Sequence, residues 1–153
     1  DRSPSRGLGD VYKRQRLDRP EYLARYKLAD LFLDTHPYNA GTTASDALKM
    51  GLPMITMKGK SYQARMGASI VNSVGIQELI TNSPEEYESL AIELATNPDK
   101  LKIIKKKLKV NLSLTPLFDT KLFTRNLEKA YSEIYNRHHN GLSPNHIYVE
   151  NSN

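Results

Sequence analysis

A strand, loop, helix and strand pattern in residues 34–53 constrains the fold of this chain more than any other feature. An apolar run ends at Asp34, a loop follows, and the paired residues Thr42 and Thr43 open a short helical pattern. Gly51 is typical of a helix C-terminus, and a second apolar run comes directly after it. Strands that alternate with helices predict βαβ units, a parallel sheet and right-handed crossovers.

The start of this predicted helix is a candidate anion site. A helix N-terminus has unpaired N–H donors and a partial positive charge, which favour phosphate. Thr42 and Thr43 add hydroxyls at the same point, and Gly41 allows a close backbone approach. Asp46 follows one turn later, where a carboxylate can accept hydrogen bonds from ribose. The structural alternative is that the threonines cap the helix and that Asp46 is a favourable charge near its start.

Three short strands and six helices are expected in the chain. The expected strands are residues 30–34, 53–57 and 78–81. The expected helices are residues 20–29, 43–50 and 61–74, followed by helices that begin at Ser83, at Pro98 and at Asp119 or Thr120. A doubly wound sheet usually has more strands. We therefore predict an α/β chain with a partial parallel sheet and C-terminal helices.

The distribution of charge along the chain argues against a nucleic-acid-binding protein. Six basic and three acidic residues among the first 19 supply +3 of the formal net charge of +5, so the rest of the chain is nearly neutral. The lysines of residues 100–109 surround apolar residues at helical spacing, which indicates an amphipathic surface helix. A nucleic-acid-binding face is the alternative, although no aromatic residue lies between these lysines.

The sequence has no candidate membrane span, secretory signal or cysteine. We therefore expect a cytoplasmic protein without a membrane span. Residues 1–15 lack hydrophobic periodicity and resemble a translated sequencing adapter, so a non-native leader is expected there. Residues 16–140 are expected to form the folded lobe, and residues 141–153 a flexible polar tail.

Residues 17–140 resemble the O-linked N-acetylglucosamine transferase family, with its SPINDLY-like and bacterial tetratricopeptide-associated members (glycosyltransferase family 41). The resemblance rests on ordered motifs: LADLFLDT at 28–35, PYNAGTTASDAL at 37–48, GLP at 51–53, ARMGAS at 64–69 and TPLFDT at 115–120. It implies the Rossmann-like C-terminal lobe of a GT-B glycosyltransferase. The implied reaction is inverting transfer of N-acetylglucosamine from UDP-N-acetylglucosamine to Ser or Thr hydroxyls of an acceptor protein, with no metal or other cofactor.

The resemblance also assigns roles around the helix start. Thr42 and Thr43 match the threonines that bind the pyrophosphate, and Asp46 matches the carboxylate that contacts the ribose. Gly41 stands where members often have a histidine, so one phosphate contact of the family is missing here.

Three residues before the first strand match the part of the family's site that holds the nucleoside. Arg25 matches an arginine near the uracil, and Tyr22 stands where a histidine often lies against the base. Arg19 stands where members often have a lysine that reaches the ribose. The structural alternatives are a solvated surface arginine for Arg25 and ordinary helix packing for Tyr22.

No catalytic residue and no metal ligand is identified in this sequence. The family's N-terminal lobe, its acceptor-side histidines and its upstream tetratricopeptide repeats are not in it, so we expect the isolated chain to be inactive. Two alternatives stay open beside the transferase: a pseudoenzyme that only binds a UDP-sugar, and a related protein glycosyltransferase that uses UDP-glucose.

Overall fold

The computed structural model describes residues 17–150, and within them three short strands form one parallel sheet. The strands are β1 (Phe32–Leu33), β2 (Met54–Met57) and β3 (Ile80–Thr81), in the order β1-β2-β3. Phe32 pairs with Met54, and Thr56 pairs with Ile80. The predicted α/β class with a partial parallel sheet is confirmed.

Each strand is shorter than the sequence pattern predicted. β1 stops at Leu33 because the next residue, Asp34, turns its side chain back onto the backbone of the following loop. β3 begins at Ile80, because Gln77–Leu79 form a 3₁₀ turn in place of extended chain.

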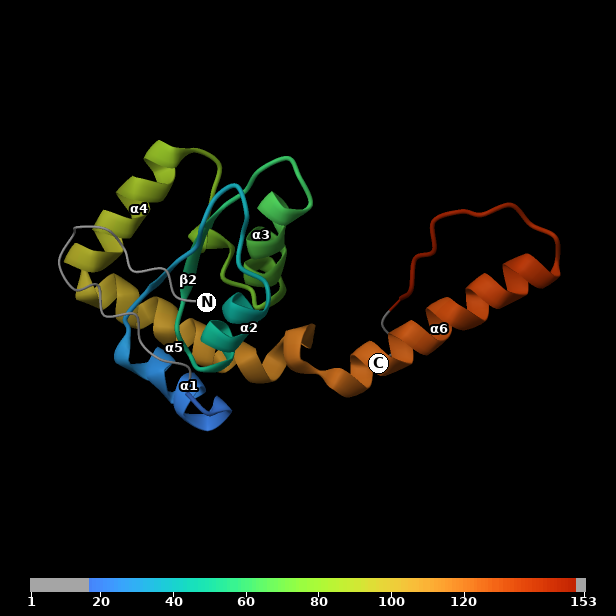
Figure 1. Ribbon diagram of the computed structural model, residues 1–153, viewed down its shortest axis with the longest axis horizontal. Coiled ribbons are helices and arrows are strands. Elements are labelled where there is room, and N and C mark those ends of the chain that lie inside the picture. Colours follow the sequence, from blue (N-terminus) through green and yellow to red (C-terminus); the bar gives the residue numbers. More distant parts are fainter. Residues whose placement is uncertain (1–16, 151–153) are drawn as a thin grey trace.

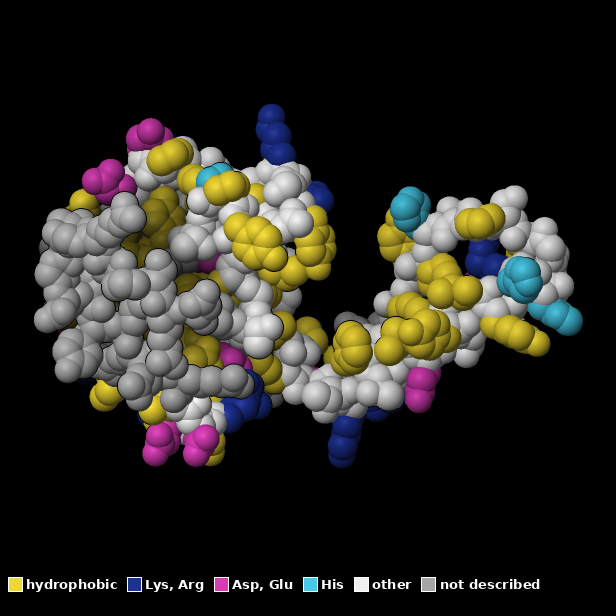
Figure 2. Space-filling model, viewed as in Figure 1, with side chains coloured by type: hydrophobic (Ala, Val, Ile, Leu, Met, Phe, Trp, Pro, Cys, Tyr) yellow, Lys and Arg dark blue, Asp and Glu magenta, His cyan; other side chains and the backbone are white. Residues whose placement is uncertain are grey.

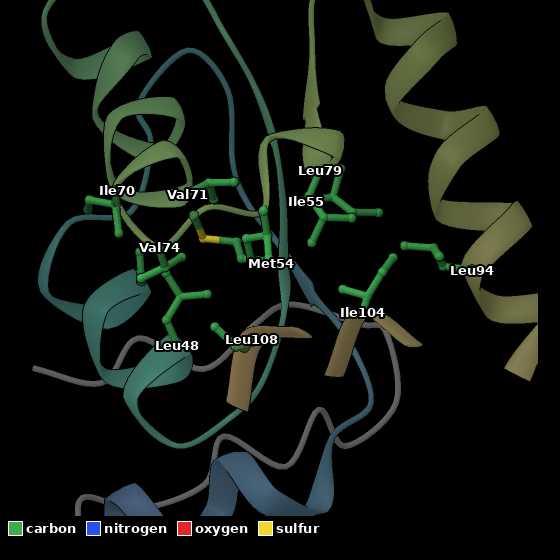
Figure 3. Close-up of a cluster of buried hydrophobic side chains, with 12 residues drawn as sticks. Leu48, Met54, Ile55, Ile70, Val71, Val74, Leu79, Leu94, Ile104 and Leu108 are labelled. Carbon is green, nitrogen blue, oxygen red and sulfur yellow. The ribbon is translucent and has the colours of Figure 1, made fainter. Parts of the chain in front are cut away.

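Helices cover both faces of the sheet (Figure 1). α2 (Thr42–Lys49) and α3 (Gln63–Ser73) lie on one side of β2, and α4 (Pro84–Thr96) and α5 (Pro98–Leu114) lie on the other. Figure 3 shows side chains from all four helices converging on β2. Met54 and Ile55 are both fully buried although neighbouring strand residues face opposite ways, as expected for a parallel sheet covered on both faces.

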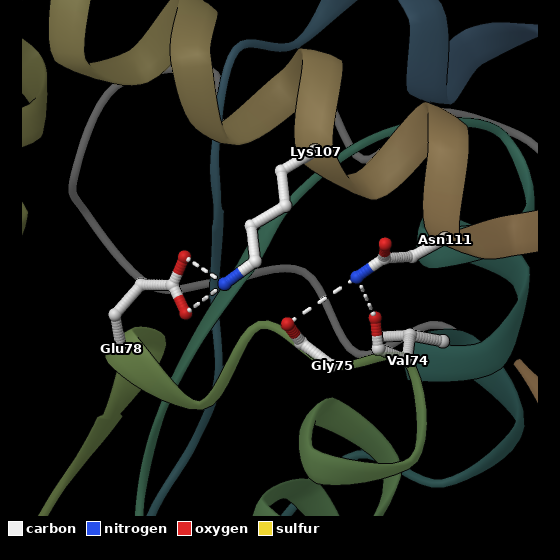
Figure 4. Close-up of polar contacts among 5 residues, drawn as sticks. All are labelled: Val74, Gly75, Glu78, Lys107 and Asn111. Atoms are coloured by element: carbon white, nitrogen blue, oxygen red, sulfur yellow. Dashed lines mark hydrogen bonds and ion pairs between the residues drawn. The ribbon is translucent and has the colours of Figure 1, made fainter.

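Polar contacts from α5 hold the turn that follows α3 (Figure 4). The Asn111 side chain donates from Nδ2 to the carbonyl oxygens of Val74 and Gly75, at 2.8 and 3.3 Å. Lys107 Nζ lies 2.8 Å from a carboxylate oxygen of Glu78. α5 therefore contacts the connection between α3 and β3 through its polar side, while Ile104 and Leu108 are buried in the core.

The lysine-rich helix is amphipathic, as predicted. Ile104 and Leu108 are buried in the core. Lys105 forms an ion pair with Asp30 at 2.7 Å, and Lys100 forms one with Glu93 at 2.6 Å. Together with the pair at Lys107, half of the six lysines between residues 100 and 109 have carboxylate partners, so much of this positive charge is matched within the fold.

The two ends of the described chain are less tightly packed. The predicted helix over residues 20–29 is shorter: α1 (Arg19–Arg25) passes into a 3₁₀ turn (Tyr26–Leu28), and none of its residues is buried. α6 (Thr120–His139) follows a 3₁₀ turn (Pro116–Phe118) and extends away from the sheet (Figure 1).

The apolar face of α6 is exposed, although its spacing is typical of a core helix. Phe123 is 66% exposed and Tyr135 is also 66% exposed. Figure 2 shows hydrophobic side chains along one side of α6 and charged ones on the other. Residues 141–150 hold no helix or strand, and the carbonyl of Ser143 accepts a hydrogen bond of 2.8 Å from Arg137 Nη2 on α6. The expected leader, residues 1–15, lies outside the described residues.

Candidate functional site

The amino terminus of α2 presents two threonines to solvent. Gly41 is the N-cap residue, and its carbonyl accepts from Ser45 N at 3.0 Å to close the first helical turn. Thr42 and Thr43 are the first two helical residues, and both are exposed. Neither hydroxyl has a hydrogen-bond partner within residues 17–150. The capping alternative is therefore wrong, because the cap position belongs to Gly41 and the threonine hydroxyls point to no group of the helix.

Asp46 lies one turn further along α2 and is only 6% exposed. Its Oδ1 accepts a charge-assisted hydrogen bond of 2.9 Å from Nη2 of Arg19, on α1. The second alternative, that Asp46 is a favourable charge in the first helical turn, is also wrong, since α2 has no acidic residue in its first turn. A ligand hydroxyl that approached this oxygen would meet an acceptor already oriented by the arginine.

α1 and the 3₁₀ turn that follows it supply two tyrosines beside this ion pair. The hydroxyl groups of Tyr22 and Tyr26 lie 2.6 Å apart, and their rings meet edge to face with centroids 5.4 Å apart. Burial, followed by the hydrogen bond to Tyr22, raises the pKa of Tyr26 well above its ordinary value. The neutral phenol is therefore the form present near neutral pH.

A cavity of about 480 Å³ opens between α1 and β1. Its lining is mostly apolar and aromatic, with one arginine. It is formed by Tyr22, Arg25, Tyr26, Ala29, Leu31, Phe32, Leu33 and Leu52. A planar heterocycle fits the character of such a lining, with the arginine as a polar contact at its side.

The structure thus sorts the seven predicted residues into two groups. Arg19 and Asp46 are in direct contact, and Tyr22 and Arg25 line the cavity from the same helix as Arg19. The remaining three, Gly41, Thr42 and Thr43, do not line this cavity. Asp46 connects the groups, because it shares α2 with the threonines and an ion pair with α1. Their roles toward a ligand stay predictions.

Sequence reasoning missed the two residues that shape the loop before α2. Asp34 and Asn39 are 7% and 3% exposed, yet both are polar and belong to a surface loop. The available signal was a carboxylate placed directly after an apolar run, where a strand ends at the edge of a parallel sheet.

Comparison with known proteins decides the family. The sequence profile of glycosyl transferase family 41 matches residues 15–127, which is most of the chain. The chain belongs to glycosyl transferase family 41.

Two plant proteins of this family illustrate the similarity. A probable UDP-N-acetylglucosamine–peptide N-acetylglucosaminyltransferase SEC of Arabidopsis thaliana is 39% identical over 130 residues, or 84% of this chain. The corresponding SPINDLY protein of Hordeum vulgare is 36% identical over 124 residues, or 81% of this chain. In each case the match spans only 13% of the relative, so this chain corresponds to a small part of those proteins.

A solved structure agrees with this family 41 assignment. A mutant O-GlcNAc transferase of Thermobaculum terrenum matches with a TM-score of 0.73 and 34% identity, over 78% of this chain and 23% of the other. The likeness confirms the predicted fold class, a Rossmann-like part of a GT-B glycosyltransferase.

The described residues contain neither a cluster of metal ligands nor a membrane-spanning helix. No group of three His, Cys, Asp or Glu side chains comes together in residues 17–150 as a set of metal ligands. None of the helices in the same part of the chain has the length and apolar character needed to cross a membrane.

Proposed function

We propose that this chain is the donor-binding part of a family 41 transferase and that it holds a UDP-sugar across α1 and α2. One observation carries the proposal: two exposed threonine hydroxyls, without hydrogen-bond partners among residues 17–150, open a helix whose next turn holds a buried carboxylate, Asp46. The relatives are named as probable transferases of N-acetylglucosamine from the UDP-sugar to a peptide, which supports UDP-N-acetylglucosamine as the donor.

The two groups of residues would contact different parts of the UDP-sugar. The hydroxyls of Thr42 and Thr43 and the N–H groups at the start of α2 would bind the diphosphate by donating hydrogen bonds to it, at the positive end of the helix. Asp46 would accept from the ribose, and the aromatic cavity beside Tyr22 and Arg25 would take the uracil. Arg19 would then sit near the ribose through its contact with Asp46.

The chemistry proposed for the whole protein is inverting glycosyl transfer. The bond between the anomeric carbon and the phosphate oxygen breaks, and the new bond forms to a Ser or Thr hydroxyl of the acceptor protein, which loses its proton to a base. Negative charge develops on the departing UDP, and donors at the start of α2 stabilise that charge without reorganising. We propose that this stabilisation comes from protein donors, with no metal cofactor.

The groups outside this chain complete the proposed enzyme. An N-terminal lobe would supply the acceptor groove and the base, and tetratricopeptide repeats would recognise the acceptor protein. Nucleic acid is not among the proposed partners, and a cytoplasmic location stays a prediction. These statements rest on the family.

Calorimetric titration of UDP tests the proposal on the 153-residue chain. The variant is the double substitution Thr42→Ala/Thr43→Ala, which removes two exposed hydroxyls and leaves every described hydrogen bond of the fold in place. Because hydrogen bonds to a charged ligand contribute about 1.5–3 kcal/mol each, the affinity for UDP is expected to fall at least about tenfold.

Thr120→Ala/Thr124→Ala on α6 is the matched control. It likewise replaces two exposed threonines by alanine, here near the start of α6, and UDP affinity is expected to stay at the wild-type value. Equal affinity of wild type and the Thr42/Thr43 variant would contradict the proposed phosphate site. Absence of UDP binding to a folded wild-type chain would contradict donor binding by this part of the protein alone.

A further inference from the structure

The segment between β1 and α2 is closed at its base by one buried side chain, that of Asp34. Oδ1 accepts two backbone hydrogen bonds, from Thr35 N at 2.9 Å and from Ala40 N at 2.7 Å. Oδ2 accepts from the hydroxyl of Thr56, on β2, at 2.7 Å. One carboxylate therefore joins the first residue of the loop, the residue before the N-cap of α2, and the neighbouring strand.

Asn39 reinforces the same closure from inside the loop. Its Nδ2 donates to the carbonyl of Thr35 at 2.8 Å, and its Oδ1 accepts from Gly67 N, on α3, at 3.3 Å. The backbone N–H of Asn39 donates to the carbonyl of Gln63 at 3.2 Å. The loop is thus fixed to α3 as well as to β1 and β2.

The space between the Asp34 carboxylate and α3 is filled. A Cβ added to Gly67 would overlap both Oδ2 of Asp34 and Oγ1 of Thr56. From the other side, the hydroxyl of Tyr87, on α4, donates to the Asp34 carbonyl at 2.8 Å. Asp34 is consequently held in place, and three protein donors satisfy its carboxylate.

We infer that Asp34 is a positioning residue for the donor site: its buried carboxylate fixes Ala40 and so sets where the amino terminus of α2 meets the diphosphate. The inference deepens the proposed function and rests on it. Ala40, whose N–H donates a hydrogen bond to Asp34, lies only two residues before Thr42. A shift of this contact therefore moves the N–H groups and hydroxyls at the helix start. Donors aimed in advance at a charged group stabilise it more than donors that must be ordered on binding.

Uridine and UDP separate this role from a general contribution to stability. The two ligands share the base and the ribose, and only UDP has the diphosphate. In Asp34→Ala the affinity for UDP is expected to fall about tenfold, as for one lost or misdirected hydrogen bond to a charged group, while the affinity for uridine stays constant. A merely structural defect lowers both affinities together.

Asp34→Asn is the matched control. Its amide oxygen can still accept from Thr35 N and Ala40 N, and its NH₂ can donate to the Thr56 hydroxyl. The ratio of UDP to uridine affinity is expected to stay within about threefold of the wild type. An unchanged ratio in Asp34→Ala would overturn the inference, as would equal loss of both ligands.

Amide hydrogen exchange provides a readout that needs no nucleotide. In Asp34→Ala the amide of Ala40 is expected to exchange at least about tenfold faster, because its acceptor is gone, while the buried amide of Val71 in α3 keeps its protection. If wild type binds no UDP, the proposed function fails on this chain, and exchange still decides whether Asp34 holds the loop. Unchanged protection at Ala40 would refute it.

Thr56→Val is used if Asp34→Ala does not unfold cooperatively. This variant keeps the side-chain volume and removes only the donor to Oδ2. A fall of the UDP to uridine ratio clearly beyond about threefold supports the inference, and a ratio within about threefold of the wild type overturns it.

Discussion

Replacing Gly67 by alanine tests the close contact between α3 and the ends of β1 and β2. Gly67 is buried in the interior of α3, where it donates to Asn39 Oδ1. The added Cβ would overlap the oxygens of Asp34 and Thr56 that form the 2.7 Å hydrogen bond. Relief of this overlap requires α3 to move outward or the hydrogen bond to break.

The magnitude follows from two opposing terms. Overpacking of a filled interior costs about 1–3 kcal/mol. Alanine is favoured over glycine inside a helix by about 1 kcal/mol, which offsets part of that cost. Because the added Cβ overlaps two hydrogen-bonded oxygens at once, the overpacking cost falls in the upper part of that range, about 2–3 kcal/mol, and we expect Gly67→Ala to lower the free energy of unfolding by about 1–2 kcal/mol.

Urea unfolding followed by circular dichroism measures this difference. Ser69→Ala is the control, because Ser69 lies on the exposed side of the same helix, and its change should stay within about 0.5 kcal/mol. If Gly67→Ala is instead as stable as the wild type, or more stable by the helix-propensity term, the contact between α3 and the Asp34–Thr56 pair is not as close as described.

Two further predictions concern the ligand site and its pH dependence. Within the described part of the chain, a Cβ at Gly41 meets only Met66 Cγ, at 4.0 Å, so Gly41→His is expected to fold normally. This variant is expected to bind UDP about tenfold more tightly in calorimetry, by restoring the phosphate contact that the family resemblance implies for a histidine there; unchanged or weaker binding would contradict this. Because the pKa of Tyr26 is raised in the folded chain, its contribution to stability is complete below the pKa of the unfolded state, near 10, and is lost as pH rises above it. Denaturation at increasing pH should therefore show a fall in stability above about pH 10 that is smaller in Tyr26→Phe, and equal falls would refute the assignment.

The parts of the fold that depend on local signals could be predicted from the sequence. Ser83 caps α4, with its hydroxyl accepting from Glu86 N at 3.2 Å, at the position where the sequence predicted that a helix begins. Gly51 ends α2 with φ +82°, a conformation that glycine adopts without strain. Alternation of apolar runs and helical periods was enough to predict the parallel sheet, because each signal lies within a few residues.

The parts that depend on distant residues could not be predicted in this way. The ion pair between Arg19 and Asp46 joins positions 27 apart, and the hydrogen bond between Asp34 and Thr56 joins positions 22 apart. Periodicity predicts an apolar face on α6, but it does not tell whether another element covers that face, and within residues 17–150 none of its residues is buried. The candidate residues at the start of α2 were predicted from the helix pattern, whereas Arg19, Tyr22 and Arg25 were predicted only through the family resemblance.

Amide chemical-shift mapping with UDP and with uridine tests directly whether the diphosphate binds at the start of α2. The difference between the two ligands isolates the diphosphate. We expect the amides of Thr42, Thr43 and Ala44, at the start of α2, to shift with UDP and not with uridine. If the diphosphate-dependent shifts gather elsewhere, for example on the lysine-rich surface of α5, the phosphate site proposed here is wrong.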